Sequence, residues 1–312
     1  MPLGPMGPQS PPFAIATRDQ VRANGTLVEN RLTTGVARIT GHTIEARDDH
    51  DAELVAAADA LARVDLRGVH DRVRIVATAR RIGDVRVDDV TLTVTRGARS
   101  IVTTPEQLHA DLRHLDAGDA NAGAASRTMP ILWKNGSAAV LLHEAAGHAA
   151  EHQHAPLAWP AWLTVHDEPR AAVDDCGEPT RVTDLLREAP ASYRRESFRD
   201  VPLRRMSNLV ARQHGAPFEL PPQRIEIELL TGGVYEPLTE TVSLFVSAAT
   251  LVDGDATQPL APFVITETRA AIVGALRGAT GEPLRYPGVV CSSEGQEVVV
   301  GSHAPLVLTV FA

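Results

Sequence analysis

Two histidines and a glutamate stand close together in residues 143–148, which read HEAAGH and follow the apolar run AAVLL. Imidazole nitrogens are common zinc ligands, and a neighbouring carboxylate can activate a zinc-bound water by taking its proton. The pattern is typical of a hydrolytic zinc site. The apolar surroundings predict a buried helix, where three ionisable side chains need a strong reason to be present. The alternative is ordinary polar side chains on a helix.

The spacing of the two histidines is unusual. They are five residues apart, whereas the common zinc-peptidase pattern places them four apart. On a regular α-helix a five-residue step turns the second side chain by about 140° from the first. Both can reach one ion only if the helix widens or ends between them. Gly147 is predicted to permit this, because glycine accepts unusual backbone dihedral angles.

A catalytic zinc ion usually has three protein ligands, so a third residue is expected beside His143 and His148. His152 follows His148 by four residues, on the same helix face, and His154 comes next. Cys291 ends an apolar strand before a polar glycine turn, although it could also be a small buried hydrophobic residue. The local sequence favours neither Cys291 nor His152 as the third ligand.

Composition excludes several classes of protein. The 312 residues carry a formal net charge of -9, and Lys134 is the only lysine, with no Lys/Arg-rich stretch. A general nucleic-acid-binding protein is therefore not expected. No apolar run has the length of a transmembrane helix. Two cysteines are too few for a disulfide framework, and the start of the chain lacks the features of a signal peptide. We expect a cytoplasmic protein.

The apolar periodicity predicts an α+β fold with antiparallel sheets, since no β-α-β alternation is present. Strands are predicted over 26–47, 73–76, 85–94, 131–133, 225–230, around Val234, and over 241–252 and 306–311, and helices over 51–64, 105–115, 138–152 and 266–276. A small-residue stretch near 120 suggests a boundary. We predict a disordered tail (1–15), an N-terminal α+β domain (16–122) and a C-terminal β-rich domain (123–312) with the metal motif.

Four blocks of the sequence together resemble the TldD/PmbA metallopeptidase family, once called modulators of DNA gyrase. The blocks are LLHEAAGH followed by Glu151, DDCGEPT at 174–180, RRES with P-x-x-R-M-S-N between 194 and 208, and CSSEGQ with a later VG between 291 and 301. They fall in the family's order and cover roughly residues 130–312. The resemblance implies a two-domain TldD/PmbA-like fold, with an N-terminal domain that is reduced because this chain is short for the family.

The resemblance also implies a ligand set. It assigns Zn²⁺ to His143, His148 and Cys291, and the catalytic base to Glu144. His152 matches nothing in the family pattern and is interpreted as a surface or substrate-side residue. Cys176 occupies a position that is usually acidic in the family block, so it is interpreted as incidental.

The predicted function is zinc-dependent hydrolysis of peptide or amide bonds in short unfolded or modified peptides. One alternative is an amide hydrolase or deacylase acting on a small natural-product intermediate, and another is a non-catalytic partner subunit, against which the intact motif argues. The family works in pairs, so we expect a dimer, either with itself or with a motif-less TldE/PmbA-like homologue. Substrate contacts are predicted at Arg195, Glu196, Gly232, Gly233 and His152, and the strand at 229–234 could pair with an extended peptide.

Overall fold

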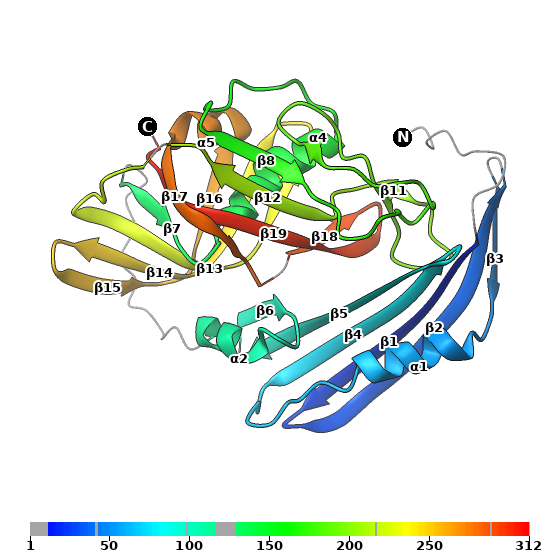
Figure 1. Cartoon of the computed structure of the whole chain (residues 1–312). Coiled ribbons are helices and arrows are strands. Elements are labelled where there is room, and N and C mark those ends of the chain that lie inside the picture. The colour runs from blue at the N-terminus through cyan, green and yellow to red at the C-terminus, as the bar shows by residue number, and fades with distance from the viewer. Residues whose placement is uncertain are drawn as a thin grey trace.

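The computed structural model describes residues 12–40, 43–97, 99–115, 129–215, 217–287 and 289–311, and at positions 39, 40 and 43 the backbone alone. Two large β-sheets dominate these ranges, one of six strands and one of eleven, beside a two-stranded ribbon. Figure 1 shows the six-stranded sheet, in blue to cyan, beneath the body formed by the rest of the chain. The fold is α+β, as predicted.

The six-stranded sheet has the order β3-β2-β1-β4-β5-β6 and is antiparallel throughout. Its first strand starts at Phe13, so residues 13–15 of the predicted tail belong to the sheet. Residues 1–11 and the predicted boundary at 122/123 lie outside the described residues. The elements are β1 (Phe13–Ala23), β2 (Thr26–Thr40), β3 (Thr43–Asp48), α1 (Ala52–Leu61), β4 (Arg72–Ile82), β5 (Val85–Arg96), β6 (Arg99–Thr103), α2 (Leu108–Asp111) and a 3-10 turn (Leu112–Leu115).

Helix α1 covers one face of this sheet. Asp51 caps it by accepting hydrogen bonds from the amides of residues 53 and 54. Its buried Leu54 and Ala58 pack on Ala16 and Ala79, whose small side chains let the helix approach the strands closely. The helix predicted over 105–115 begins later than expected, since Gln107 and not Thr104 precedes its first turn. The α-helix ends at Asp111, and a 3-10 turn continues to Leu115.

The eleven-stranded sheet has the order β15-β14-β13-β7-β19-β12-β8-β9, with β16 paired to β14 and β17 and β18 paired to β19. Most pairs are antiparallel, as predicted, but β7 with β13 and β12 with β19 are parallel, which differs from the prediction. Parallel pairs need long crossover connections, and the chain between β7 and β13 includes the motif helix. The strands and the remaining helix are β7 (Ile131–Trp133), β8 (Leu163–Asp167), β9 (Thr183–Asp184), β10 (Tyr193–Arg194), β11 (Leu203–Arg204), β12 (Asn208–Gln213), β13 (Gln223–Glu236), β14 (Thr241–Asp253), β15 (Ala256–Leu260), β16 (Phe263–Thr268), α5 (Arg269–Ala275), β17 (Leu276–Arg285), β18 (Val289–Ser293) and β19 (Gln296–Thr309).

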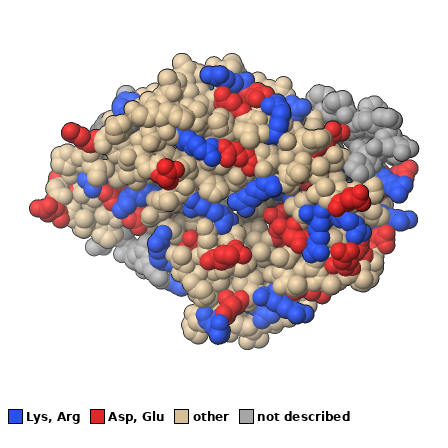
Figure 2. Space-filling model, in the orientation of Figure 1, with Lys and Arg blue, Asp and Glu red and all other residues tan. Residues whose placement is uncertain are grey.

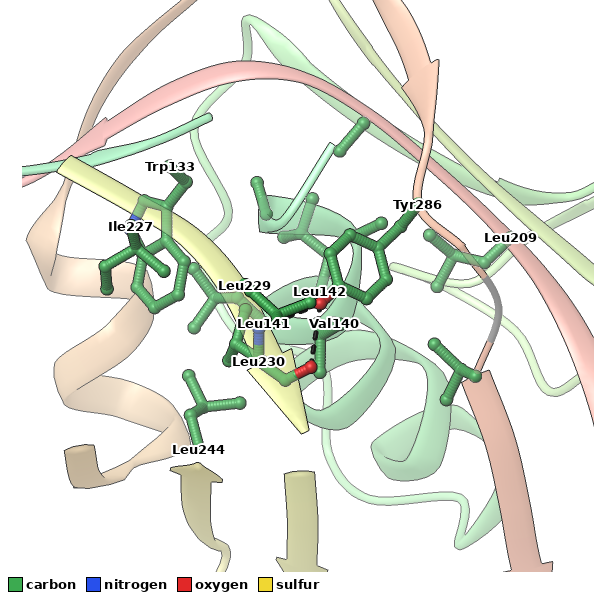
Figure 3. Close-up of a cluster of buried hydrophobic side chains, with 14 of the residues drawn as sticks. Trp133, Val140, Leu141, Leu142, Leu209, Ile227, Leu229, Leu230, Leu244 and Tyr286 are labelled. Carbon is green, nitrogen blue, oxygen red and sulfur yellow. Dashed lines mark hydrogen bonds between the residues drawn. The ribbon is translucent and has the colours of Figure 1, made fainter. Parts of the chain in front are cut away.

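The motif helix is embedded in the core of this larger sheet. Val140, Leu141 and Leu142 pack among Trp133 and the apolar side chains of β13, as Figure 3 shows. Because residues 138–147 are all buried, the predicted burial of this helix is confirmed. Among the described residues, no helix has the length and apolar character needed to cross a membrane.

The six-stranded sheet and the larger sheet with its helices form two bodies. They meet where the segment before β11 reaches the face of the six-stranded sheet that α1 does not cover. The ring of Phe198 lies directly over Gly35, where any Cβ would overlap it. Arg195 stacks 4.2 Å from the centroid of the Phe13 ring, and Arg80 pairs with Asp175 at 3.2 Å. These contacts fix the N-terminal sheet against the body that carries the HEAAGH motif.

Candidate metal centre

The motif helix widens at the two histidines. It consists of α3 (Ala138–Leu142), one π-helical turn (His143–His148) and α4 (Ala149–Glu151). Hydrogen bonding from i to i+5 brings residues five apart onto one face, as i to i+4 bonding does for residues four apart. The imidazole centroids are accordingly 4.9 Å apart. The predicted departure from α-geometry is confirmed.

Gly147 has a different role from the one predicted. This residue is not among the glycines with positive φ, so the turn does not require its conformational freedom. A Cβ at this position would instead overlap Sδ of Met206, which is fully buried. Glycine is therefore needed because a core side chain packs on the helix backbone here.

The structure brings the side chains of His143, His148 and Cys291 together. One nitrogen of each imidazole and the sulfur all lie within 4.8 Å of one another. Cys291 arrives from β18, which pairs with β19 in a hairpin, and is 2% exposed. Arg205, itself buried, donates a 2.6 Å hydrogen bond to the Cys291 carbonyl oxygen and so fixes the strand at this point.

The geometry of this cluster fits a zinc ion. Cys291 Sγ is 3.6 Å from His148 Nε2, and two tetrahedral ligands with Zn–N and Zn–S bonds of roughly 2.0–2.3 Å are about 3.6 Å apart. His143 is fully buried, and neither of its ring nitrogens has a hydrogen-bond partner among the described residues. Burial, together with His148 and Arg205, holds the pKa of His143 well below its ordinary value, so its nitrogens are available as acceptors. An orphaned buried imidazole is costly unless something binds it.

Glu151 orients the second imidazole. Its Oε2 lies 2.9 Å from His148 Nδ1, so Nδ1 carries a proton and Nε2 points toward Cys291. Its Oε1 accepts from the Met206 amide at 2.9 Å. Burial opposes ionisation of Glu151, but the bonds from His148 and Met206 lower its pKa overall. Metal-binding histidines commonly donate their other nitrogen in this way.

From the sequence alone, Glu151 is only part of the family signature. Its spacing of three residues from His148 is the signal that could have given it this role. Burial opposes a charge on His148, but the bonds to Cys291 and Glu151 raise its pKa well above the ordinary value. Metal binding at Nε2 would therefore release a proton.

Glu144 lies beside the cluster without belonging to it. Its Oε2 is 3.7 Å from His148 Nε2 and has no hydrogen-bond partner in the described structure. Burial raises its pKa to about 7, a change that His148 opposes and Glu151 reinforces. Gly233 of β13 makes room for this side chain, since a Cβ there would be 2.6 Å from Glu144 Cγ.

A cavity of about 280 Å³ opens onto Glu144. Gly232 and Gly233 form part of its wall, so two of the predicted substrate-contacting residues do lie beside the carboxylate. The rest of the wall is mostly apolar and comes from both bodies of the molecule: Ile101 and Val102 of β6, with Val140, Leu229, Leu230, Phe245, Tyr286, Pro287, Val289 and Val290.

The other predicted substrate contacts lie elsewhere. Arg195 is 3% exposed and held between the Phe13 ring and the Asp175 carbonyl oxygen, to which it donates at 2.6 Å, so it supports the junction of the two bodies. Glu196 accepts from the Glu297 amide of β19 at 2.8 Å and does not line the cavity at Glu144.

The remaining histidine and cysteine candidates are also separate from the cluster. His152 is exposed, outside the group of converging donors, and its ring centroid is 6.1 Å from that of Tyr235. Cys176 is buried, and burial with the nearby Asp174 raises the pKa of its thiol to about 12. A thiol in that state is unreactive, which agrees with its interpretation as incidental.

Solved structures resemble the chain, although no family model and no curated protein matches its sequence. TldE from Thermococcus kodakarensis superposes with a TM-score of 0.54 at 9% identity, over 96% of this chain and 96% of that chain. A Thermotoga maritima MSB8 protein described as a modulator of a DNA gyrase gives a TM-score of 0.50 at 12% identity, over 96% of each chain. At such low identity the likeness concerns the fold alone. The chain has a TldD/TldE-like fold, as its sequence blocks predict.

Proposed function

We propose that this chain is a zinc-dependent hydrolase of peptide or amide bonds. The observation that carries the proposal is the convergence of His143, His148 and Cys291 within 4.8 Å, beside the buried carboxylate of Glu144. Three nitrogen and sulfur donors leave a position for water or substrate, which distinguishes a catalytic from a structural zinc site. A bound zinc ion would supply Lewis-acid polarisation of the scissile carbonyl and of the attacking water.

Glu144 provides the proton transfer in this proposal. The carboxylate lies 3.7 Å from His148 Nε2, beside the proposed zinc ligands, where it would take a proton from the attacking water and return it to the leaving amine. Its environment is dry, which strengthens electrostatic interactions with charge that develops in the transition state. Glu151 keeps His148 in the tautomer that presents Nε2, and Arg205 keeps Cys291 in place through its carbonyl oxygen.

The edge of β13 beside Glu144 supports an extended peptide as substrate. β7 pairs with β13 only at residues 225–227, and within the described ranges no strand continues this pairing beyond Ile227 on that side. The Leu230 amide and carbonyl oxygen are instead both bonded to the Tyr286 hydroxyl, at 2.8 Å each, as the dashed lines in Figure 3 show. A peptide strand could add along Thr231 and the glycines, gaining affinity from backbone hydrogen bonds. The apolar wall of the cavity favours apolar side chains near the cleaved bond.

A small natural-product amide is the second candidate substrate. The cavity of about 280 Å³ at Glu144 is near the lower limit of small-molecule sites, roughly 300 Å³. Hydrolysis of labelled unfolded peptides, compared with acyl-amide reporter compounds, separates the two. We also propose that the chain works as a cytoplasmic dimer, with itself or with a TldE-like homologue. Light scattering after co-expression tests this assembly.

The central experiment is Glu144→Ala. Its zinc content, measured by mass spectrometry of the metal, should equal that of the unaltered protein, because all three donors remain. Peptide hydrolysis should fall by roughly 10²–10⁴-fold, the usual contribution of a general base. Glu219→Ala, at an exposed carboxylate, is the matched control and should change neither. Full activity in Glu144→Ala with normal zinc content would remove Glu144 from the mechanism.

A further inference from the structure

A second cavity, of about 580 Å³, lies between the six-stranded sheet and the larger body. Strands β4, β5 and β6 form one wall, and residues 169–175, 192–194 and β19 form the other. The cavity shares Val102 and Pro287 with the one at Glu144, so the two hollows adjoin. A substrate bound at Glu144 can therefore extend into it. Figure 2, in the orientation of Figure 1, shows basic and acidic side chains both on the lower part of the molecule, which holds the six-stranded sheet, and on the part above it.

The acidic side chains of this larger cavity already have partners. Asp88 pairs with Arg86 at 2.8 Å, and Asp89 pairs with Arg80 at 2.8 Å. Asp175 pairs with the same Arg80 at 3.2 Å. The two remaining acids are held by neutral donors: Asp174 accepts hydrogen bonds from the backbone amides of Cys176, Glu178 and Tyr193, and Glu106 is bonded to the side chain of Thr104.

Three arginines of the same cavity have neutral acceptors instead. Arg194 donates to the Val299 carbonyl oxygen at 2.7 Å, and Arg170 donates to Asn208 Oδ1 at 3.5 Å. Arg285 donates to Thr104 Oγ1 at 3.1 Å and to Gln107. Within the described part of the chain, none of the three forms an ion pair with a carboxylate. All three arginines line the cavity, and their charge is not neutralised by a directly bonded carboxylate.

Arg285 is the most poorly compensated of the three. Its Nε is buried and has no hydrogen-bond partner among the described residues. Burial and the neighbouring Arg170 lower its pKa, against the opposing effect of Asp111 and Glu106. Arg170 and Arg285 line the same cavity, and two guanidinium groups there attract an anion because its oxygens can accept charge-assisted hydrogen bonds from both.

We propose that this cavity binds an anionic group of the substrate, a carboxylate or a phosphate remote from the cleaved bond, and that Arg170 and Arg285 contact it. The inference rests on the proposed function, because it treats the two adjoining cavities as one substrate cleft. It makes the enzyme selective for chains that combine an apolar segment at Glu144 with an acidic segment a few residues away.

Binding of matched peptides tests the proposal without turnover. Three fluorescein-labelled unfolded decapeptides alternate leucine with aspartate, asparagine or phosphoserine, and their affinities for the Glu144→Ala protein are measured by fluorescence anisotropy. The aspartate or phosphoserine peptide should bind about tenfold more tightly than the asparagine peptide, since charged hydrogen bonds are worth more than neutral ones. The tighter of the two identifies the anion.

Substitution of the arginines locates the effect. In the same Glu144→Ala background, Arg170→Gln with Arg285→Gln should abolish the preference and leave the affinity for the asparagine peptide within about twofold of its starting value. Arg86→Gln is the control, since Arg86 lines the same cavity but is paired with Asp88. If the double variant does not fold, Arg170→Gln alone serves, because that side chain is exposed and makes one long hydrogen bond.

Two outcomes would overturn the proposed anion site. One is equal affinity for all three peptides, and the other is an equal loss of affinity for all three peptides in the arginine variants. Failure of the proposed function looks different. In that case the preference for anionic peptides persists, while the protein with Glu144 intact, loaded with zinc, hydrolyses none of them.

Discussion

The motif helix and the six-stranded sheet place charged groups in opposite surroundings. On the helix, Glu144 and Glu151 are 3% and 5% exposed, and Glu151 is bonded to His148 on the same helix and to the Met206 amide between β11 and β12. On the sheet, many charges form cross-strand pairs at the surface. Arg74 and Asp19 are typical, 2.9 Å apart with side chains that are 52% and 27% exposed.

This contrast indicates that substitutions at the buried charges should cost more stability or metal affinity than substitutions at the exposed pairs. A buried charge whose partner is removed keeps its full desolvation cost, whereas an exposed pair exchanges its partner for water. Buried charged groups are retained only where something compensates them, and at the motif helix the proposed zinc ion would supply part of that compensation. The sheet needs no such explanation for its charges.

Removal of the proposed thiolate ligand, Cys291, should have the largest effect. Structural zinc sites gain roughly 10–16 kcal/mol from four ligands, so one ligand is worth roughly 3 kcal/mol, or about 100-fold in affinity. Cys291→Ala should weaken zinc binding by that factor, as measured by competition with a chelator. His152→Ala, at an exposed histidine outside the cluster, should leave the affinity unchanged. Zinc lost from the His152 variant and kept by the Cys291 variant would reverse the ligand assignment.

A methyl group at Gly147 should be the next most damaging change. It would overlap Sδ of the fully buried Met206, and overpacking of this kind costs roughly 1–3 kcal/mol. Gly274→Ala is the matched control, because a Cβ there meets nothing within 4 Å and its helix should gain up to about 1 kcal/mol. Denaturant unfolding of both variants gives the comparison. Equal stability of the two would show that Met206 yields easily.

The motif helix was the most predictable part of the fold. Its burial follows from the apolar residues around the histidines, and its widening follows from their five-residue spacing. Both signals are local. Cys291 is different, since it is 143 residues from His148 in sequence and meets it only through the β18–β19 hairpin. Local patterns left it even with His152, and only the resemblance to a family favoured it.

For the N-terminal sheet, the presence of strands was predictable, but their order and register were not. Alternating residues indicated strands, yet β1 was missed and the lengths of β4 and β5 were underestimated. Strand order and register depend on contacts between distant segments, which periodicity does not encode. The packing of Phe198 on Gly35 joins the two bodies through such a contact. For the same reason, the sequence did not predict that this sheet lines both cavities.

A smaller effect is expected at the residue that orients His148. Glu151→Gln keeps the shape of the side chain but removes the charge that accepts from His148 Nδ1 at 2.9 Å. Partners of this kind usually contribute 10–100-fold in metal affinity, and we expect roughly 10-fold weaker zinc binding because glutamine still offers a carbonyl oxygen. Chelator competition measures it, with Glu219→Gln as the exposed control. An unchanged affinity would mean that the bond to Glu151 does not hold the imidazole.

The smallest effect should come from the surface of the six-stranded sheet. Arg74→Gln removes the pair with Asp19, in which both Nε and Nη2 donate to the carboxylate. Because both side chains remain in contact with water, the loss should be below about 1 kcal/mol and should shrink further at high salt. Zinc affinity should not change, since this pair lies on the sheet and touches no residue of the cluster. Denaturant unfolding at low and high salt measures the stability term. A cost of several kcal/mol, or a loss of zinc, would contradict the distinction between a buried centre that depends on every partner and a surface that does not.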